Sequence, residues 1–486
     1  MLTAFTLKNF KSFRDARLPL GTLTMLVGAN SSGKSNLIEA LRLLSWIGQG
    51  QRLPNIQRAL SADDQVIRGR IHEILPEGET TFTLGCEIEA ETWNKLTVTL
   101  ENRNGDLHIA EESVTDKATG AALYMVIPGS LHGNIRVSYN NIARGGKKPQ
   151  IICSDQMAVF CQLDTEGRFG AKHEKARKII PEAAAIFGRE LSNMLILDPI
   201  PAKMRGYSFP SEWELGNDGR NLSSTLCRLI DSEINLNNLP TSTKFNKKHE
   251  QEILELLIKK AEKIKEQPDT SLIKRFEERE LIKIKKLENQ NIIINFCKSI
   301  PEQQIKDIDF QTTPRGEVMV TLTETFGGKV REVPAALLSD GTLRVLAIAA
   351  AMLSAPEGGL VVIEEIDNGV HPSRAKHLIE KIYEIAKARS LRVLLSTHNP
   401  ALLDALPDAA LPDAVFCYRD PEHGDSRLVR LADLPSYPKL VAQGPLGYLT
   451  TTGALDRFVK QRPRIEAGRK RGKAWLESLD AERTDD

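Results

Sequence analysis

The chain has 486 residues, a formal net charge of +1, and 41% hydrophobic and 27% charged residues. These values are typical of a soluble globular protein. A nearly neutral chain is not attracted as a whole to nucleic acid or to a membrane surface, so any such contact must come from a local patch. No apolar run approaches the roughly 18 residues that a membrane-spanning helix needs, and the first residues lack the pattern of a signal peptide. We therefore expect a cytoplasmic protein without a membrane partner.

The six cysteines lie far apart and form no metal-binding spacing such as C-x-x-C. In a reducing cytosol each one is expected to be a small buried apolar residue. The cysteines therefore predict neither a disulfide framework nor a zinc site.

The first 200 residues predict an α/β fold. The apolar runs Leu2–Leu7 and Leu23–Val27 predict strands, and the apolar spacing of Asn36–Leu44 predicts a helix. Between residues 80 and 127 apolar and polar residues alternate, which predicts an antiparallel sheet with a hairpin turn at Asn104-Gly105. The segment 174–199 then predicts a helix followed by a short strand.

A charged segment with apolar residues at helical spacing lies between Pro240 and Pro301, and it is broken once at 268–271. This pattern predicts an antiparallel helical hairpin, whose charge we expect to face solvent. The predicted segments are an N-terminal lobe (1–236), the hairpin (237–301), a C-terminal α/β lobe (302–445) and a basic tail (446–486).

The octapeptide GANSSGKS at 28–35 lies between the second strand and the first helix, as the phosphate-binding pattern G-x-x-x-x-G-K-[ST] requires. Gly28 and Gly33 allow the loop to turn its backbone N–H groups inward, and the helix directs its positive end to the same point. Lys34 supplies a charge for the outer phosphates, and Ser35 offers a hydroxyl to Mg²⁺. The chain is therefore predicted to bind ATP with Mg²⁺. The predicted ATP-binding residues of this loop and first helical turn are Gly28, Asn30, Ser31, Ser32, Gly33, Lys34, Ser35 and Asn36.

A second motif is the continuous apolar strand Leu360–Ile363, which is followed by Glu364 and Glu365. Such runs are typical of parallel strands buried on both faces, whose carboxyl ends face the ligand crevice. One carboxylate can hold Mg²⁺, and a second can orient the attacking water and accept its proton. We assign Glu364 to the metal and Glu365 to the water.

A third strand, Leu391–Ser396, is followed by His398. A histidine at the carboxyl end of a parallel strand can hydrogen-bond the charge that develops on the γ-phosphate. We therefore assign His398 a catalytic role together with Glu365 and Lys34.

Ser339, Asp340 and Gly341 precede a strongly apolar helix. A helix that begins with small residues is a second phosphate site through its free N–H groups and its dipole, and Ser339 or Asp340 could cap it. Because one γ-phosphate is not expected to need two helix N-termini from one domain, we expect this segment to complete the site of a neighbouring subunit.

Together these motifs resemble the SMC/RecF-type branch of the ABC ATPases and, more narrowly, the OLD-like ATPases. The matching segments occur in the family's order: LKNFKSF (7–13), GANSSGKS (28–35), LLSDGT (337–342), VVIEEIDNGVHP (361–372) and LLSTHNP (394–400). The resemblance covers about 1–235 and 302–445. It implies an ABC-type ATPase head that the hairpin interrupts, a homodimer in which two heads enclose two ATP molecules, and assembly into a higher oligomer.

The resemblance also implies that Lys11, or a neighbouring aromatic residue such as Phe13, lies near the nucleotide. The chain departs from the family at Glu364, where the family has Asp, and the longer side chain could displace the metal or slow turnover. Its signature segment is LSDGT instead of an LSGGQ-like sequence. The glutamine of the family's Q-loop stays open between Gln156 and Gln162.

OLD-type nucleases carry a metal-dependent TOPRIM domain after the ATPase, but the residues after His398 lack its D-x-D cluster, and the hairpin lacks the C-x-x-C of a zinc hook. We therefore expect a separate partner nuclease of the HNH or TOPRIM type. In this respect the chain is similar to the ATPase subunits of bacterial anti-phage systems, Septu PtuA first and then AriA of PARIS. The basic segment 460–473 is expected either to dock a partner or nucleic acid or to be a solvated tail.

Three functions follow from these patterns. The first is an ATPase that dimerises around nucleotide and regulates a partner nuclease in phage defence. The second is a RecF-like DNA repair clamp that grips DNA. The third is a nucleotide-sensing scaffold with negligible hydrolysis, which the departure at Glu364 favours.

Overall fold

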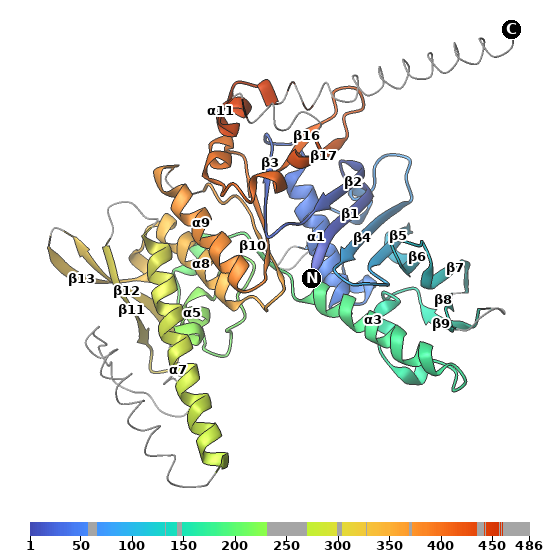
Figure 1. Ribbon diagram of the computed structural model, residues 1–486, viewed down its shortest axis with the longest axis horizontal. Coiled ribbons are helices and arrows are strands. Elements are labelled where there is room, and N and C mark those ends of the chain that lie inside the picture. Colours follow the sequence, from blue (N-terminus) through green and yellow to red (C-terminus); the bar gives the residue numbers. More distant parts are fainter. Residues whose placement is uncertain are drawn as a thin grey trace. The chain divides into compact units, whose positions relative to one another are not determined.

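The computed structural model describes residues 1–56, 66–131, 133–142, 148–230, 270–298, 304–326, 328–368, 372–434, 442, 444–455, 457 and 459. The chain divides into two compact units (Figure 1). Unit 1 comprises Met1–Asp198 and Ala355–Asp486, and unit 2 comprises Pro199–Ser354. Both units combine helices with sheets, which confirms the α/β class predicted from the sequence.

Unit 1 contains an antiparallel sheet of eight strands in the order β2-β1-β4-β5-β6-β7-β8-β9. The strands are β1 (Leu2–Phe10), β2 (Phe13–Pro19), β4 (Thr81–Ile88), β5 (Lys95–Arg103), β6 (Asp106–Thr115), β7 (Ala122–Leu131), β8 (Asn134–Tyr139) and β9 (Gln150–Ser154). The predicted hairpin turn is confirmed, because Asn104 and Gly105 join β5 to β6 with φ angles of 55° and 94°. Strand β2 was not predicted, since its charged sequence FRDARLP hides the alternation of its three buried residues.

The second sheet of unit 1 has the order β10-β14-β15-β3-β16-β17, and its first five strands run parallel. Its strands are β10 (Leu195–Leu197), β14 (Leu360–Ile363), β15 (Arg392–Thr397), β3 (Leu23–Val27), β16 (Val415–Arg419) and β17 (Ser426–Arg430). Every residue of β3 and β14 is buried, as their continuous apolar sequences predict.

The helices of unit 1 are α1 (Lys34–Gly48), α3 (Glu174–Ser192), α9 (Pro372–Ala388) and α11 (Leu446–Thr451). Short 3₁₀ turns complete it at Leu53–Asn55, Ile71–Glu73, Phe160–Gln162, Glu166–Arg168, Pro400–Ala405, Leu411–Asp413 and Leu431–Asp433. One apolar cluster contains residues of both sheets together with α1 and α3, for example Phe5, Leu41, Phe187 and Val362. Helix α1 is therefore held by the core shared between the two sheets.

Unit 2 contains the antiparallel sheet β11-β12-β13. Its elements are α4 (Pro201–Met204), α5 (Leu222–Ile230), α7 (Thr270–Cys297), β11 (Gln304–Thr312), β12 (Val318–Phe326), β13 (Lys329–Pro334), the 3₁₀ turn Ala335–Leu337 and α8 (Asp340–Ser354). Helix α7 corresponds to the second arm of the predicted hairpin, whereas the first arm lies outside the described residues. Helix α8 is buried without interruption from Thr342 to Met352 except at Arg344, and it packs against α5 and α7.

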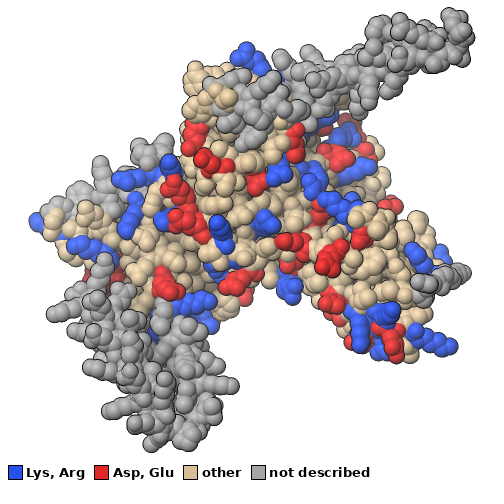
Figure 2. Space-filling model, in the orientation of Figure 1, with Lys and Arg blue, Asp and Glu red and all other residues tan. Residues whose placement is uncertain are grey.

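On the face shown in Figure 2, Lys and Arg side chains are interspersed with Asp and Glu side chains over the described residues. This mixture is consistent with the formal net charge of +1. Within the described part of the chain, no helix is both long and apolar enough to span a bilayer. The basic segment 460–473 lies outside the described residues.

A buried carboxylate lies on β6, between β5 and β7 of the antiparallel sheet. Glu112 of β6 accepts hydrogen bonds from the Tyr124 hydroxyl at 2.7 Å, from the Val159 N–H at 2.6 Å and from the Phe160 N–H at 2.7 Å. Burial raises the pKa of Glu112 to about 7, although these three donors act in the opposite direction. The folded protein therefore keeps a proton on Glu112 at pH values where the unfolded chain has released it.

This proton predicts a fall in the free energy of unfolding as pH rises from about 4.5 to about 7, by up to about 3 kcal/mol in total. Replacing Glu112 by Gln removes the titrating group, so we expect Glu112→Gln to flatten this pH dependence. Urea unfolding at pH 5, 6 and 7, followed by circular dichroism, measures it. The neighbouring exposed Glu111 provides the control, Glu111→Gln, which should keep the wild-type slope. Equal slopes for Glu112→Gln and the wild type would contradict the assignment.

Candidate active site

The predicted site residues come from three strands of the parallel sheet that end at the same edge. Ile363, the last residue of β14, pairs with Leu395 of β15, and Thr397, the last residue of β15, pairs with Val27 at the end of β3. The segments after these strands contain the phosphate-binding loop, Glu364 and Glu365, and His398, so the pairing brings them to one edge of the sheet.

The loop after β3 leaves the start of α1 open. Gly33 is the N-cap of α1 with a φ of 118°, and no side chain caps the helix there. The first N–H groups of a helix have no intrahelical partner. Asn30, Ser31 and Ser35 are exposed around this end, and the buried hydroxyl of Ser32 has no hydrogen-bond partner within the described chain. This arrangement fits a phosphate group, which would accept several of these free donors.

Lys34 folds back onto the loop. Its ammonium donates hydrogen bonds to the carbonyl oxygens of Gly28 at 2.6 Å and Ala29 at 3.1 Å. Burial lowers the pKa of Lys34, while the Glu365 and Asp367 carboxylates act electrostatically in the opposite direction. The two carboxylates that act on Lys34 thus come from the turn after β14.

Glu364, predicted to hold the metal, is engaged by a cation. Its Oε1 lies 2.5 Å from Nη2 of Arg42 in α1. Burial raises the pKa of the Glu364 carboxyl to about 7, although Arg42 acts in the opposite direction, and Asp198 adds to the rise. To bind a metal, Glu364 would have to exchange this ion pair for the new ligand.

Glu365, predicted to be the base, is held through its backbone and its side chain. Its N–H donates to the Ser396 hydroxyl at 3.0 Å, and its carboxylate accepts a 2.5 Å hydrogen bond from the side-chain amide of Asn368. Its φ angle of 48° is in the left-handed region, which is uncommon for a residue other than glycine. Such conformations cost of order 1–3 kcal/mol and are concentrated at functional sites.

Asp367 is a site residue that sequence reasoning missed. Its carboxylate accepts a 2.8 Å hydrogen bond from the Thr397 hydroxyl and lies 2.9 Å from Nδ1 of His398. The sequence contained an indication of this role, since Asp367 is an acidic residue two positions after Glu365 and lies in the same turn. Only the strand pairing, however, shows that this turn meets the residues that follow β15.

Two side chains that the sequence predicts to contact ATP, those of Lys11 and Asn36, contact other residues in this structure. The ammonium of Lys11 contacts the carboxylate of Glu39, one helical turn beyond Ser35, and donates to the carbonyl oxygen of Arg68 at 2.9 Å. The side-chain amide of Asn36 donates to the Ser12 hydroxyl at 2.8 Å. Their contact with a nucleotide stays a prediction.

The ring of Phe13, the alternative to Lys11, is fully buried in the core of unit 1, so it presents no exposed face to a nucleotide. Of the two Q-loop candidates, Gln162 has its side-chain amide hydrogen-bonded to the backbone of Ser154 and Met157.

The signature segment belongs to unit 2. Ser339 caps α8, since its hydroxyl accepts a 3.1 Å hydrogen bond from the Thr342 N–H, as the sequence predicts. Asp340 forms a 2.5 Å ion pair with Arg205, whose guanidinium also donates to the carbonyl oxygen of Leu338 at 2.5 Å. The side chain of Leu337, just before this segment, is 75% exposed.

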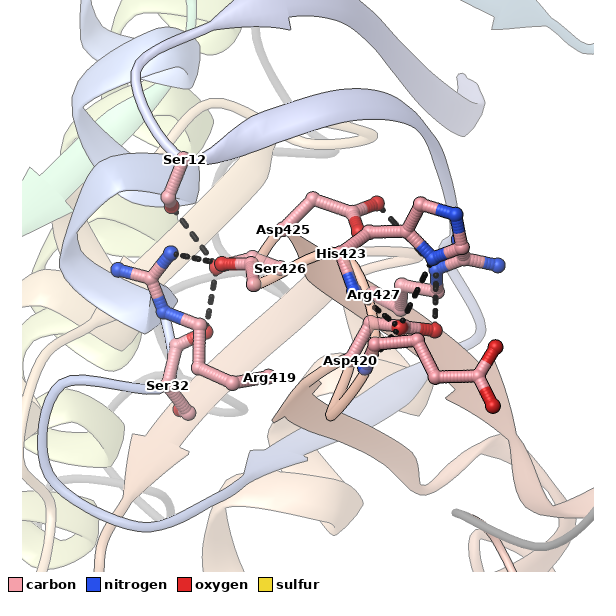
Figure 3. A network of polar contacts seen from close by, with 10 residues as sticks. Ser12, Ser32, Arg419, Asp420, His423, Asp425, Ser426 and Arg427 are labelled. Atoms are coloured by element: carbon pink, nitrogen blue, oxygen red, sulfur yellow. Dashed lines mark hydrogen bonds and ion pairs between the residues drawn. The ribbon is translucent and has the colours of Figure 1, made fainter.

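The hairpin of β16 and β17 supports the phosphate-binding loop from the side, a contact that the sequence did not predict (Figure 3). Nε of Arg419 donates to the Ser31 carbonyl oxygen at 3.0 Å. The hydroxyl of Ser426 lies 2.6 Å from the Ser32 carbonyl oxygen and 2.8 Å from the Ser12 hydroxyl. These bonds hold two loop carbonyl groups towards the hairpin.

The close approach of this hairpin also explains both loop glycines. A Cβ on Gly28 would lie 2.3 Å from the Cys417 carbonyl oxygen, and one on Gly33 would lie 2.3 Å from the Ser426 hydroxyl oxygen. Any side chain at either position would therefore displace the hairpin or the loop. At Gly33 the positive φ adds backbone strain.

At its tip the hairpin brings Asp420, His423 and Asp425 together, with potential ligand atoms within 4.8 Å of one another. Arg427, however, forms 3.2 Å ion pairs with both carboxylates, and Asp420 also accepts bonds from the backbone N–H groups of Glu422 and His423 (Figure 3). Hydrogen bonding within the turn accounts for this cluster without a metal.

Two family models match the sequence, and both describe ATPase domains. The model "AAA ATPase domain" matches residues 1–68, and the model "AAA domain, putative AbiEii toxin, Type IV TA system" matches residues 167–404. These ranges include the phosphate-binding loop, the signature segment, the acidic strand and His398. Both matches support an ATPase domain in this chain. No curated protein matches the sequence.

Solved structures of SMC head domains are similar at 15% identity. They include a head bound to the C-terminal winged-helix domain of ScpA, with a TM-score of 0.41 over 88% of this chain and 96% of the other. A head with an extended coiled coil from Pyrococcus furiosus, bound to the C-terminal domain of ScpA, has a TM-score of 0.40 over 91% and 99%. The head from Thermotoga maritima has a TM-score of 0.35 over 88% and 98%. At these values the likenesses are too distant to transfer a partner to this chain.

The hairpin contact predicts that Ser426→Ala weakens ATP binding. Losing one hydrogen bond to the loop costs about 1 kcal/mol, so we expect the dissociation constant for ATP to rise about fivefold. Isothermal titration calorimetry with ATP and Mg²⁺ measures it. The exposed Ser211 of unit 2 supplies the control, Ser211→Ala, which should bind as the wild type does. Unchanged affinity in Ser426→Ala would show that the hairpin does not support the loop.

Proposed function

We propose that this AAA-type ATPase domain binds ATP at the loop 28–35 and hydrolyses it with Glu365 as the general base. The observation that carries the proposal is the shared sheet edge, where the loop, the turn with Glu365 and the residue His398 follow three paired parallel strands. Within this arrangement the Glu365 and Asp367 carboxylates act electrostatically on Lys34, as expected if all three face the same phosphates.

In the proposed reaction, free N–H groups of the loop and of α1, together with Lys34, bind the β- and γ-phosphates. Glu365 orients a water whose oxygen attacks the γ-phosphorus, and it accepts the water's proton as the bond to the β–γ bridging oxygen breaks. His398 hydrogen-bonds the γ-phosphate. A Mg²⁺ ion, held by the Ser35 hydroxyl and the Glu364 carboxylate, would neutralise charge on the phosphates.

We further propose that two copies close around ATP, with the segment Ser339–Gly341 of one copy completing the site of the other. The exposed positions of Ser339 and Asp340 at the start of α8 support this proposal, as does the exposed Leu337 beside them. For the biological role, the resemblance of the sequence motifs to anti-phage ATPase subunits supports the regulation of a separate nuclease.

One observation favours a second candidate function, a nucleotide-sensing scaffold that hydrolyses ATP negligibly. Glu364 is longer than the aspartate usual at its position, and it is already paired with Arg42. If this pair persists with ATP bound, the carboxylate is not available to the metal, and hydrolysis would be slow.

Glu365→Gln tests the catalytic assignment. Glutamine keeps the shape of the side chain but cannot accept the proton, so we expect kcat for phosphate release to fall by about 10²- to 10⁴-fold while ATP still binds. The exposed Glu357 provides the control Glu357→Gln, which should hydrolyse normally. In contrast, Lys34→Ala should weaken ATP binding itself by about tenfold to a hundredfold.

Normal turnover by Glu365→Gln would rule out the base assignment, and no turnover by the wild type would favour the scaffold.

The same variant tests the dimer. With ATP and Mg²⁺, Glu365→Gln should sediment as a dimer, and adding Ser339→Arg should leave it monomeric although ATP still binds. A nucleotide-independent dimer that tolerates Ser339→Arg would contradict the shared site.

The proposed role in defence is tested by phage plating on cells that carry the gene with its flanking genes. We expect the wild type to reduce plating and Lys34→Ala to abolish the reduction, because the partner nuclease is regulated through the nucleotide site. Deleting a flanking nuclease gene should have the same effect. Equal plating with the wild type and Lys34→Ala, at equal protein levels, would argue against this role.

A further inference from the structure

We propose that Asp367 is a positioning residue, which fixes the tautomer and the orientation of His398 so that the outer ring nitrogen, Nε2, faces the γ-phosphate. This inference rests on the proposed ATPase function and assigns one more residue to it. Asp367 acts through His398 and does not itself touch the nucleotide.

The contacts of the two side chains support this role. The side chain of Asp367 is 6% exposed and that of His398 is 45% exposed, so the carboxylate is fixed inside the protein while the ring reaches the surface. One carboxylate oxygen accepts from the Thr397 hydroxyl at 2.8 Å, and the other lies 2.9 Å from His398 Nδ1. The two oxygens are therefore engaged by two consecutive residues, the last residue of β15 and the residue that follows it.

The hydrogens can be assigned from these contacts. The Asn399 N–H donates to the Thr397 hydroxyl oxygen at 3.0 Å, which leaves the hydroxyl hydrogen for Asp367. An ionised carboxylate has no hydrogen to donate, so Nδ1 of His398 must carry the one in its contact. The ring is thus held as the Nδ1–H tautomer, and Nε2 is the nitrogen left for a ligand.

Backbone pairing keeps Asp367 in place relative to His398. The N–H of Ile366 donates to the Ser396 carbonyl oxygen at 3.0 Å, and the N–H of Glu365 donates to the Ser396 hydroxyl at 3.0 Å. The turn that carries Asp367 is therefore tied to the end of β15, two residues before His398. A ring oriented by so rigid a support has little freedom to lose when the nucleotide binds.

The orientation has a chemical consequence for the γ-phosphate. Phosphate oxygens accept hydrogen bonds, so Nε2 must present a hydrogen to them. With Nδ1–H donated to Asp367, a hydrogen on Nε2 makes the ring an imidazolium, and the Asp367 carboxylate beside it offsets this charge. Asp367 is therefore expected to affect catalysis only when His398 is present.

The competing role for Asp367 is that of a metal ligand, since carboxylates suit Mg²⁺ and Asp367 acts electrostatically on Lys34. The two roles differ in their dependence on His398. A metal ligand would still matter after His398 is removed, whereas a positioning residue would not.

A double-mutant cycle on the full chain separates the two roles. Asp367→Ala and His398→Gln should each lower kcat for ATP hydrolysis by about 10- to 100-fold with little change in KM, because the contact is made in the transition state. The double variant should be no slower than His398→Gln, within about a factor of two. If Asp367→Ala lowers kcat equally in both backgrounds, Asp367 acts independently of His398 and the proposal is overturned.

A second measurement does not depend on hydrolysis. In ¹⁵N-histidine-labelled protein without nucleotide, the His398 signals, identified by their loss in His398→Gln, should show the Nδ1–H tautomer. Asp367→Ala should shift the ring towards Nε2–H, and unchanged signals of the other histidines would confirm that this variant is folded. An Nε2–H tautomer in the wild type overturns the positioning role. A wild type with the Nδ1–H tautomer but no ATPase activity would overturn only the proposed function.

Discussion

The site depends on a single constraint, the register of three parallel strands. Ile363 at the end of β14 pairs with Leu395, and Thr397 at the end of β15 pairs with Val27 at the end of β3, so β15 and β3 stop at the same level and β14 stops two residues earlier. Parallel strands also have their carboxyl ends on the same edge of the sheet. Residues more than 300 positions apart in the chain thereby reach a common edge, where the turn after β14 is also hydrogen-bonded to the end of β15. A shift of one residue in either pairing would expose the buried apolar residues of a strand and displace the segment that follows it along the edge.

The carboxylates around this edge form two groups that differ in their partners. Towards α1, buried carboxylates are paired with cations, as Glu39 is with Lys11 and Arg68, and Glu364 is with Arg42. Towards the loop, Glu365 and Asp367 have polar partners and act on Lys34 from a distance. The first group stabilises the packing of α1 on the sheet, while the second leaves carboxylate oxygens near the expected phosphates. The division explains why two adjacent glutamates, 364 and 365, have such different surroundings.

The hairpin of β16 and β17 adds a further restraint on the loop. Its hydroxyl and guanidinium groups contact the Ser32 and Ser31 carbonyl oxygens, which fixes the orientation of these two peptide units. A phosphate-binding loop must keep several N–H groups available for the phosphates, so its backbone is held through other groups, here the carbonyl oxygens. Ser426 and Arg419 supply that support from a part of the chain almost 400 residues after the loop.

The amino-acid sequence determined the local chemistry of this protein. Three short segments predicted the site: the motif GANSSGKS, the all-apolar strand before Glu364 and Glu365, and the strand before His398. Each is shorter than ten residues. Each could be recognised because a buried parallel strand and a phosphate-binding loop both restrict which residue types can occur locally. The α/β class, the turn at Asn104-Gly105 and the cap at Ser339 were predictable for the same reason. Only the tertiary structure decided which side chains meet. The pairing of Glu364 with Arg42, the burial of Phe13, the contact of Asp367 with His398 and the support of the loop by Ser426 all join residues from different elements. Such contacts depend on strand order and register, which arise from the packing of the whole core and leave no short-range pattern in the sequence.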